Sequence, residues 1–544
     1  MTESSAAPRK GAGSAWRWLG SAGLFAAVLV WSSETCVAQP YIEWERVFGG
    51  DTGGLANSIR QTPDGGYLAA GITDSFGIGC FDAYFVKLSP NGDLDPAWPE
   101  NPRTHGWVRS SELIRSVVPT RDGGYLAVGS TDLLSYSDIY VIKLAADGGL
   151  DPRWRPNPQI IVLGSDQDYS ASVCESEDGG YVVAGKTGSL GLDGDVVLVK
   201  LTSDGQLDAQ WPENPRVLVG RGLQRPSCVR PTSDGGFIVV GDTEAFDADG
   251  EQLFGPEVYL VKLDCDGTLD ATWPENPSSL RVDDYSSGNS VVQAEDDGYV
   301  VVGSASRFVP PRSQRDALVV KFDARGVLDT GWRENPRRFG RESGDDAFAV
   351  DGTVDGGFIV AAGSAPARYR RYEVYLIKLD SAGERDPAWP QNPLSFGNGI
   401  NDVPYSVDVS VDGGFVIAGE SRTPPPPGTQ DGYIAKLGFE APAFVRGDAD
   451  SSGRIDIADG VSVLNWLYLG AAAPECAEAA DADDSGDLRL SDAVTIFAWL
   501  FGGGVPPADP APSASEYLPD DCGGQRALAE DLGLGCLRPS ATCN

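Results

Sequence analysis

Two short acidic segments near the C-terminus place oxygen-bearing side chains at the spacing of a calcium loop. They are 448–459 and 481–492, which start 33 residues apart, and each has glycine at its sixth position and aspartate at its twelfth. Calcium takes about six to eight oxygen ligands, and a loop of about twelve residues supplies them from positions 1, 3, 5, 7, 9 and 12. Two in-phase copies of this pattern predict two bound Ca2+ ions.

The predicted ligands follow from that numbering. The first loop offers Asp448, Asp450, Ser452, the backbone carbonyl of Arg454, Asp456 and Asp459, and the second offers Asp481, Asp483, Ser485, the carbonyl of Asp487 and Asp492. Position 9 of the second loop is Arg489, which has no carboxylate to hold a ligating water, so this loop is expected to bind calcium more weakly. The alternative is a pair of acidic turns without metal, which the agreement between the two copies disfavours.

The composition argues against several other kinds of chemistry. The chain of 544 residues has a single histidine, His105, so it is poorly supplied for a Ser-His-Asp triad or a multi-histidine metal site. Its formal net charge is -37 and its isoelectric point is near 4.3, which disfavours binding to nucleic acid or to an anionic membrane. A soluble protein that holds divalent cations fits this composition.

The first 38 residues have the layout of a secretory signal peptide. Basic residues precede an apolar run over 19–31, and small residues over 36–38 form a cleavage site. The apolar run is shorter than the roughly 18 residues that a membrane-spanning helix needs. We therefore expect cleavage, secretion or display at the cell surface, and no membrane span afterwards, with an uncleaved membrane anchor as the alternative.

Export would leave eight cysteines in a compartment that allows disulfides. They are Cys80, Cys174, Cys228, Cys265, Cys476, Cys522, Cys536 and Cys543. Four of them lie in the C-terminal region, which ends in a Pro/Gly/Cys-rich tail over 506–544. Their pairing does not follow from the sequence.

Between these ends, one unit recurs seven times. It begins with an Asp-Gly-Gly turn and an apolar strand, as in DGGYLAAG at 64–71. The aromatic residues of the seven copies are 56 to 62 residues apart: Tyr67, Tyr125, Tyr181, Phe237, Tyr299, Phe358 and Phe415. Asp-Gly-Gly favours a tight turn, and β-branched and aromatic residues suit buried strands.

Each unit continues with a second β-rich run, in which an acid precedes a lysine by five residues. The first such pair is Asp82 with Lys87, and the last is Asp431 with Lys436. We interpret these residues as solvated or as inter-strand pairs. Six units end in a proline-rich linker whose tryptophan is expected to pack between repeats: Trp98, Trp154, Trp211, Trp273, Trp332 and Trp389.

Repeats of this length without a helical period predict β-propeller blades of about four strands each. An open solenoid is the alternative. The segment 41–50 is a lone strand and the seventh unit lacks a linker, so the N-terminal strand is expected to complete the last blade and close the ring. The span 41–440 resembles bacterial seven-bladed propellers with a repeated DGGY-AG-D-Y-VK pattern, and the predicted domain is 39–440.

The clearest departure from the repeat is a concentration of arginine in the fifth and sixth units. The residues are Arg307, Arg312, Arg315, Arg368, Tyr369, Arg370 and Arg371. They fall in equivalent loops of neighbouring units, so they are expected to converge on one rim. Guanidinium groups bind carboxylate, sulfate or phosphate bidentately. The hypothesis is a site for an anionic glycan, and the alternative is a solvated basic patch.

The segment 441–505 is similar to a dockerin. It has the duplicated loop-helix units, the aspartate at position 12 and the FVRGDAD start of the dockerin-like modules that end many secreted planctomycete proteins. The resemblance implies a small all-α calcium-binding domain whose helices, 461–469 and 494–501, dock a cohesin-like or cell-surface protein. The positions that usually select a cohesin differ, because Ile457-Ala458 and Leu490-Ser491 stand there.

The predicted fold class is therefore mainly β, a seven-bladed β-propeller followed by a small all-α, calcium-binding, dockerin-like domain. The leading function is a secreted, non-catalytic protein whose propeller binds a polysaccharide or another partner. One alternative is an extracellular O-glycosyl hydrolase or lyase, which would need only two positioned carboxylates. Another is a structural protein of the cell surface. The acids that stand out in the propeller are repeated ones, which favours binding over catalysis.

Overall fold

The computed structural model describes residues 40–439 apart from short gaps, and parts of the C-terminal segment. The gaps are 135, 191–193, 220–221, 245–254, 310–311, 341–343, 366–372, 390, 397–401 and 423–429, and the described C-terminal residues are 447, 449, 455, 457–471, 474, 480–483, 488–502 and 507. The predicted signal peptide and all but one residue of the predicted tail lie outside them. Within the described part of the chain, no helix has the length and apolar character needed to cross a membrane.

The described part of 40–439 consists of 28 strands in seven four-stranded antiparallel sheets. The innermost strands are β2 (Gly54–Gln61), β6 (Glu112–Pro119), β10 (Asp168–Glu175), β14 (Gln224–Pro231), β18 (Tyr285–Gln293), β22 (Gly344–Gly352) and β26 (Val403–Val409). The second strands are β3 (Tyr67–Thr73), β7 (Tyr125–Thr131), β11 (Tyr181–Thr187), β15 (Phe237–Thr243), β19 (Tyr299–Val309), β23 (Phe358–Ala365) and β27 (Phe415–Arg422).

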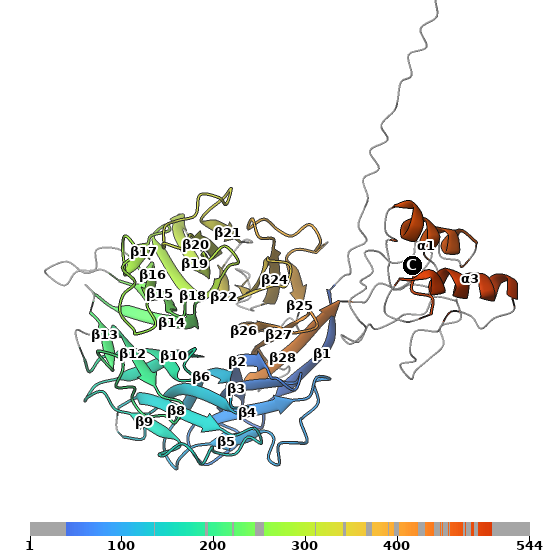
Figure 1. Cartoon of the computed structure of the whole chain (residues 1–544). Coiled ribbons are helices and arrows are strands. Elements are labelled where there is room, and N and C mark those ends of the chain that lie inside the picture. Colours follow the sequence, from blue (N-terminus) through green and yellow to red (C-terminus); the bar gives the residue numbers. More distant parts are fainter. Residues whose placement is uncertain are drawn as a thin grey trace, which may run out of the picture. The chain divides into compact units, whose positions relative to one another are not determined.

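The third strands are β4 (Asp82–Leu88), β8 (Asp138–Leu144), β12 (Asp195–Leu201), β16 (Glu257–Leu263), β20 (Arg312–Phe322), β24 (Glu373–Leu379) and β28 (Gln430–Phe439). The outer strands are β5 (Arg103–His105), β9 (Gln159–Ile161), β13 (Arg216–Leu218), β17 (Ser278–Leu280), β21 (Arg337–Phe339), β25 (Leu394–Phe396) and β1 (Pro40–Phe48). The sheets stand around a common axis, with the innermost strands nearest to it (Figure 1). This arrangement confirms the predicted seven-bladed β-propeller. We number the blades 1 to 7 from β2–β5 onward.

The ring is closed by the N-terminal strand. β1 pairs antiparallel with β28 as the outer strand of blade 7, beginning with Pro40 opposite Phe439. On the inner side of the same blade, the amide N–H of Ile59 in blade 1 donates to the Ser406 hydroxyl of blade 7 at 3.2 Å. The N-terminal strand therefore completes the last blade as expected, and the open solenoid is excluded.

A tryptophan of each blade packs on the next blade. The indole N–H of Trp44 in β1 donates to the Pro90 carbonyl of blade 1 at 3.1 Å. Gly92, with a φ of 77°, lies so close to this indole that a Cβ there would be 2.4 Å from the ring. The inter-blade ring pairs are Trp44 with Tyr67, Trp98 with Tyr125, Trp154 with Tyr181, Trp211 with Phe237, Trp273 with Tyr299, Trp332 with Phe358 and Trp389 with Phe415.

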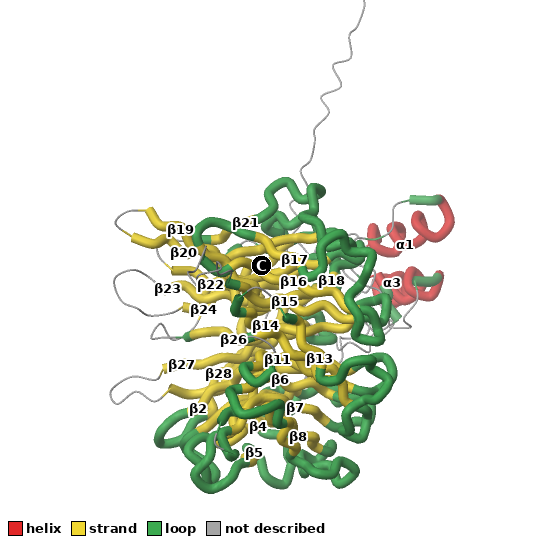
Figure 2. The backbone as a smooth tube through the Cα atoms, turned by 90° about the vertical axis from the view of Figure 1, so that its left-hand side faces the viewer, coloured by secondary structure: helices red, strands yellow, loops and turns green. Residues whose placement is uncertain are grey.

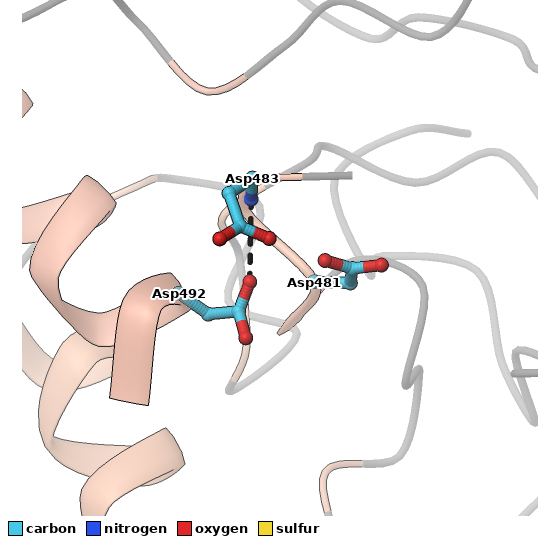
Figure 3. A group of neighbouring side chains, drawn as sticks. All are labelled: Asp481, Asp483 and Asp492. Carbon is cyan, nitrogen blue, oxygen red and sulfur yellow. Dashed lines mark hydrogen bonds between the residues drawn. The ribbon is translucent and has the colours of Figure 1, made fainter. Parts of the chain in front are cut away.

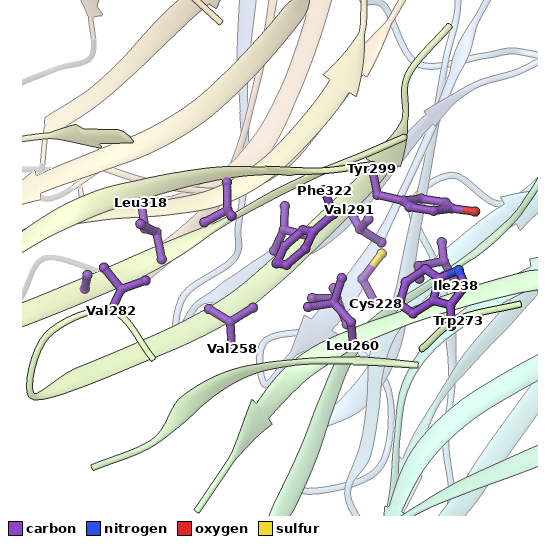
Figure 4. Close-up of a cluster of buried hydrophobic side chains, with 14 residues drawn as sticks. Cys228, Ile238, Val258, Leu260, Trp273, Val282, Val291, Tyr299, Leu318 and Phe322 are labelled. Atoms are coloured by element: carbon purple, nitrogen blue, oxygen red, sulfur yellow. The ribbon is translucent and has the colours of Figure 1, made fainter. Parts of the chain in front are cut away.

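Apolar side chains fill the space between neighbouring blades. Figure 4 shows the cluster between blades 4 and 5. Its members include Cys228, Val258, Leu260 and Trp273 from blade 4 and Val291, Tyr299 and Phe322 from blade 5. Figure 2 shows the same sheets from the side, where the long strands β19 and β20 project from one face of the ring.

The repeated lysines are buried ion pairs. Lys143 is fully buried and its ammonium lies 2.9 Å from Asp122 of the Asp-Gly-Gly turn. The seven equivalent pairs, at 2.6 to 2.9 Å, are Lys87–Asp64, Lys143–Asp122, Lys200–Asp178, Lys262–Asp234, Lys321–Asp296, Lys378–Asp355 and Lys436–Asp412. The lysines are therefore paired and not solvated, and the partner of each is the aspartate of the Asp-Gly-Gly turn.

The four described cysteines are free thiols. They are Cys80, Cys174, Cys228 and Cys265, and burial raises the pKa of the Cys174 thiol above its ordinary value. The other four cysteines of the exported chain lie outside the described residues. Disulfides therefore stay a prediction for the four C-terminal cysteines.

Two helices are described after the propeller. They are α1 (Ile457–Leu469) and α3 (Leu490–Gly502), which pack on each other. Val463 of α1, Ala493 of α3 and Ala480 from the segment between them form one buried cluster. Both helices begin about four residues earlier than the apolar pattern predicts, because the last positions of each acidic loop form the first helical turn. Asp459 and Asp492 lie in these turns, where the helix dipole favours a negative charge.

Closure by β1 predicts a large loss of stability when its buried indole is removed. Trp44→Ala is expected to lower the free energy of unfolding by about 3–5 kcal/mol, because it leaves a cavity between blades 7 and 1. Val47→Ala on the same strand is the matched control, since Val47 is 45% exposed and should cost about 0.5 kcal/mol. Urea unfolding monitored by far-UV circular dichroism measures both. Equal effects would mean that β1 does not close the ring.

The lysine pairs predict a non-additive pair of substitutions. Asp122→Asn leaves Lys143 buried beside Asp151 alone, at 3.8 Å, and is expected to cost about 3 kcal/mol of unfolding free energy. Adding Lys143→Met removes the buried charge, so the double variant should be more stable than Asp122→Asn. A double variant that is less stable than the single one would contradict this account of the pair.

The Lys143–Asp122 pair predicts that part of the folding stability is lost at low pH. Burial acts to raise the pKa of Asp122, but hydrogen bonds from the Thr120 hydroxyl, the Lys143 ammonium and the Gly124 amide outweigh it and lower the pKa to about 2. The ordinary value is 3.8, so this stabilisation is present above pH 3.8 and is lost as the pH falls through about 2. The double variant should lose less stability than the wild type over that interval.

Candidate metal centre and axial cavity

Three carboxylates of the second predicted loop converge at the start of α3. The ligand oxygens of Asp481, Asp483 and Asp492 all lie within 4.8 Å of one another (Figure 3). Asp492 comes from the first turn of the helix, whereas the other two come from the segment before it. The cluster therefore joins positions 1, 3 and 12 of the predicted loop.

Backbone hydrogen bonds hold both oxygens of Asp492. The amide N–H of Asp483 donates to its Oδ1 at 3.2 Å, and the amide N–H of Arg489 donates to its Oδ2 at 2.7 Å. Burial, together with the neighbouring carboxylates, raises the pKa of Asp492 to about 7, although these two amides act against the rise. Carboxylates this close repel one another unless a proton or a cation lies between them. Their oxygen-only chemistry suits Ca2+.

The other predicted calcium ligands are only partly described. Asp459 is fully buried in the first turn of α1, the position that corresponds to Asp492. Those outside the described residues are Asp448, Asp450, Ser452, Arg454, Asp456, Ser485 and Asp487. The first loop thus stays a prediction. The backbone of Arg489, whose side chain we expected to weaken the second loop, positions Asp492.

The arginine-rich segments are described in part. Arg307 is exposed on β19, opposite Gln314, and Arg312 begins β20. Arg315 turns toward the axis, where its Nε lies 2.7 Å from Asp346 and its Nη2 donates to Ser304 at 3.1 Å. Arg368, Tyr369, Arg370 and Arg371 lie outside the described residues, so their convergence on one rim stays a prediction.

A cavity at the propeller axis was not foreseen from the sequence. One compartment, of about 630 Å3, lies against blades 1 to 4, and a second, of about 440 Å3, lies against blades 4 to 7. Asp242 and Tyr405 line both compartments. Ile72, Asp242 and Glu420 lie near the ends of second strands, so the cavity is on the face where second strands lead into third strands.

Every innermost strand contains a β-bulge. The bulge residues line the narrowest part of the axial cavity, which we call the channel. Each strand has one extra residue that pairs with no residue of the second strand: Asn57, Arg115, Ala171, Ser227, Asn289, Phe348 and Tyr405. All seven line the channel. These equivalent positions hold different residues, unlike the repeated turns and lysines around them. Comparing the repeats would reveal this variability, although the bulge itself has no sequence signature.

The channel floor is a compensated charge network. Arg60 lies 3.7 Å from Asp408, and Asp351 accepts the amide N–H of Val409 at 3.1 Å. Burial raises the pKa of Asp408, which Arg60 and Arg230 oppose and Asp351 reinforces. The free space at this level is about 80 Å3. This space is much smaller than that of either compartment.

Comparison with known proteins assigns this chain neither a family nor an activity. No protein-family model and no curated protein matches the chain. A solved protein of unknown function from Dyadobacter fermentans is 12% identical over 74% of this chain and 99% of its own, with a TM-score of 0.40. The polysaccharide lyase Uly1 is 11% identical over 70% and 90%, with a TM-score of 0.42, and an endo-arabinase from Bacteroides thetaiotaomicron is 14% identical over 59% and 91%, with a TM-score of 0.32.

Proposed function

We propose that this chain is a secreted, calcium-binding protein of the dockerin type, in which the β-propeller is the recognition domain. The observation that carries the calcium assignment is the convergence of Asp481, Asp483 and Asp492 at the start of a helix. Two further features support it. The motif is duplicated 33 residues earlier in the sequence, and Asp459 occupies the corresponding turn of α1. One ion per loop gives two Ca2+ ions.

The surface of the two helices supports a docking role. Val461, Tyr468 and Leu469 of α1 and Val494 and Phe501 of α3 are 43 to 79% exposed. Exposed apolar side chains on a small helical pair are typical of a surface that a protein partner covers. The partner in this proposal is a cohesin-like or cell-surface protein, as the resemblance to dockerins implies.

Two of the three described carboxylates that line the two compartments are bound to arginine, which favours recognition over catalysis. Asp242 binds Arg225 at 2.8 Å, and Asp346 binds Arg315 at 2.7 Å. A glycosidase needs one carboxylic acid that donates a proton and a second that attacks or activates water. Carboxylates committed to guanidinium groups serve that purpose poorly. An O-glycosyl hydrolase or lyase remains the alternative function, and a structural surface protein is the third.

Calcium titration of the full chain tests the proposal. Isothermal titration calorimetry should give two ions per chain, and Asp492→Asn should remove one of them by taking a ligand from the second loop. Asp459→Asn should remove the other. Asp51→Asn, a substitution of an exposed propeller acid, is the matched control and should leave the stoichiometry unchanged. Absence of calcium binding in the wild type, or two ions in Asp492→Asn, would contradict the proposal.

A further inference from the structure

The axial cavity has the size of a small-ligand site. Its compartments of about 630 and 440 Å3 fall within the range of roughly 300–1,000 Å3 that such sites occupy. All seven innermost strands contribute to the walls. The bulge residues among them are the positions at which the blades differ, so the chemistry of the cavity is not imposed by the blade framework.

Two cations in the wall, Arg115 and Lys186, stand outside the ion pairs of the described residues, although the charge of Asp242 acts on Lys186. Arg225 is held by Asp242 at 2.8 Å and Glu244 at 2.6 Å, and Arg315 is held by Asp346. Arg115 and Lys186 line the same compartment as Arg225, and neither forms an ion pair with any described residue. In a chain of net charge -37, two such cations facing one cavity favour an anionic group in the ligand.

Hydrogen-bond acceptors lie around the same cavity. The side-chain amide nitrogens of Asn57 and Asn289 donate at 2.7 Å to the carbonyls of Ile114 and Ala347 in the following blades. These bonds fix both side chains and leave their Oδ1 atoms as acceptors in the wall. Glu420 adds a carboxylate to the second compartment. Acceptors at these positions match the hydroxyl groups of a polyol.

Aromatic rings complete the wall. Phe348 and Tyr405, bulge residues of adjacent blades, meet edge to face with their centroids 5.8 Å apart. Tyr285 lines the second compartment and Tyr169 the first. The flat, partly exposed faces of such rings pack against the C–H face of a sugar ring, whereas the charged groups around them bind its polar edge.

From this arrangement we infer that the axial cavity binds a carboxylated sugar chain. Arg115 and Lys186 of the first compartment receive a carboxylate. Tyr405, which lines both compartments, and Phe348 of the second pack on its rings. The inference rests on the proposed recognition role of the propeller and assigns it a site and a ligand class. It places the anionic group at the axis, on blades 2 and 3, and not at the outer arginine-rich segments of blades 5 and 6.

A titration with a matched neutral probe tests the inference. Galacturonate trisaccharide and its methyl ester have the same ring and differ in charge. The full wild-type chain should bind the acid at least tenfold more tightly than the ester, which corresponds to about 1.4 kcal/mol. Arg115→Gln should reduce this difference by weakening only the acid, because Lys186 remains as the second carboxylate partner. Phe348→Ala should weaken both probes about equally.

Arg307→Gln is the control, because Arg307 is an exposed arginine on β19 and outside the cavity wall. It should leave both affinities unchanged. Thermal melts of every variant verify folding, and Arg115 is a bulge residue whose side chain is exposed to the channel, so its loss should not unfold the ring. Equal affinity for acid and ester, or an acid preference lost in Arg307→Gln and undiminished in Arg115→Gln, would overturn the inference.

Calcium and product analysis separate this inference from the proposed function. Absence of sugar binding in a chain that still binds two Ca2+ ions would overturn the cavity assignment alone. Release of shorter products with the acid preference intact would contradict the recognition function and keep the carboxylate site. Because the cavity wall uses only propeller residues, chelation of calcium should change the sugar affinity less than twofold.

Discussion

The structure depends on one constraint, which is that the seventh blade must bind the first. Each blade presents an indole on one side and an aromatic ring on the other, and the indole packs on the aromatic ring of the next blade. The same contact recurs at every junction between blades. At the junction of blades 7 and 1 the indole comes from Trp44, near the start of the described chain, and meets Tyr67 of blade 1. β1 covers the edge of β28 that would otherwise be exposed, and closure packs blade 7 against blade 1, which fixes the innermost strands around a common axis.

In this closed ring, the residues that stabilise the blades are distinct from those that line the axial cavity. The repeated residues contact one another. The turn aspartates form ion pairs with buried lysines, and the tryptophans contact the next blade. The axial cavity is lined instead by residues that differ between blades, because the extra residue of each innermost strand faces the cavity. A ring built in this way can change the chemistry of its cavity without altering a blade core. The helical segment shows a similar division, since apolar residues form its core and its acids gather where the helices begin.

The sequence predicts the frame well because the frame repeats. Strand positions, blade number, ring closure and the role of the tryptophans all follow from seven aligned copies. The partner of each lysine did not follow from the sequence, since Asp122 and Lys143 meet only once the turn is folded against the third strand. The axial cavity was missed because a bulge leaves repeat lengths unchanged and its residue, such as Arg115 or Phe348, looks like any other strand residue. The convergence of Asp481, Asp483 and Asp492 was predictable, because their spacing is that of a calcium loop.

The claim that departures from the repeat carry the function is tested most directly by a crystal structure of the full chain with calcium and galacturonate trisaccharide. The account predicts sugar at the axis, with its carboxylate within hydrogen-bonding distance of Arg115 and its ring against Phe348. It also predicts calcium between Asp481, Asp483 and Asp492. Sugar bound on the exposed part of β19 and β20, with only solvent in the axial cavity, would contradict it.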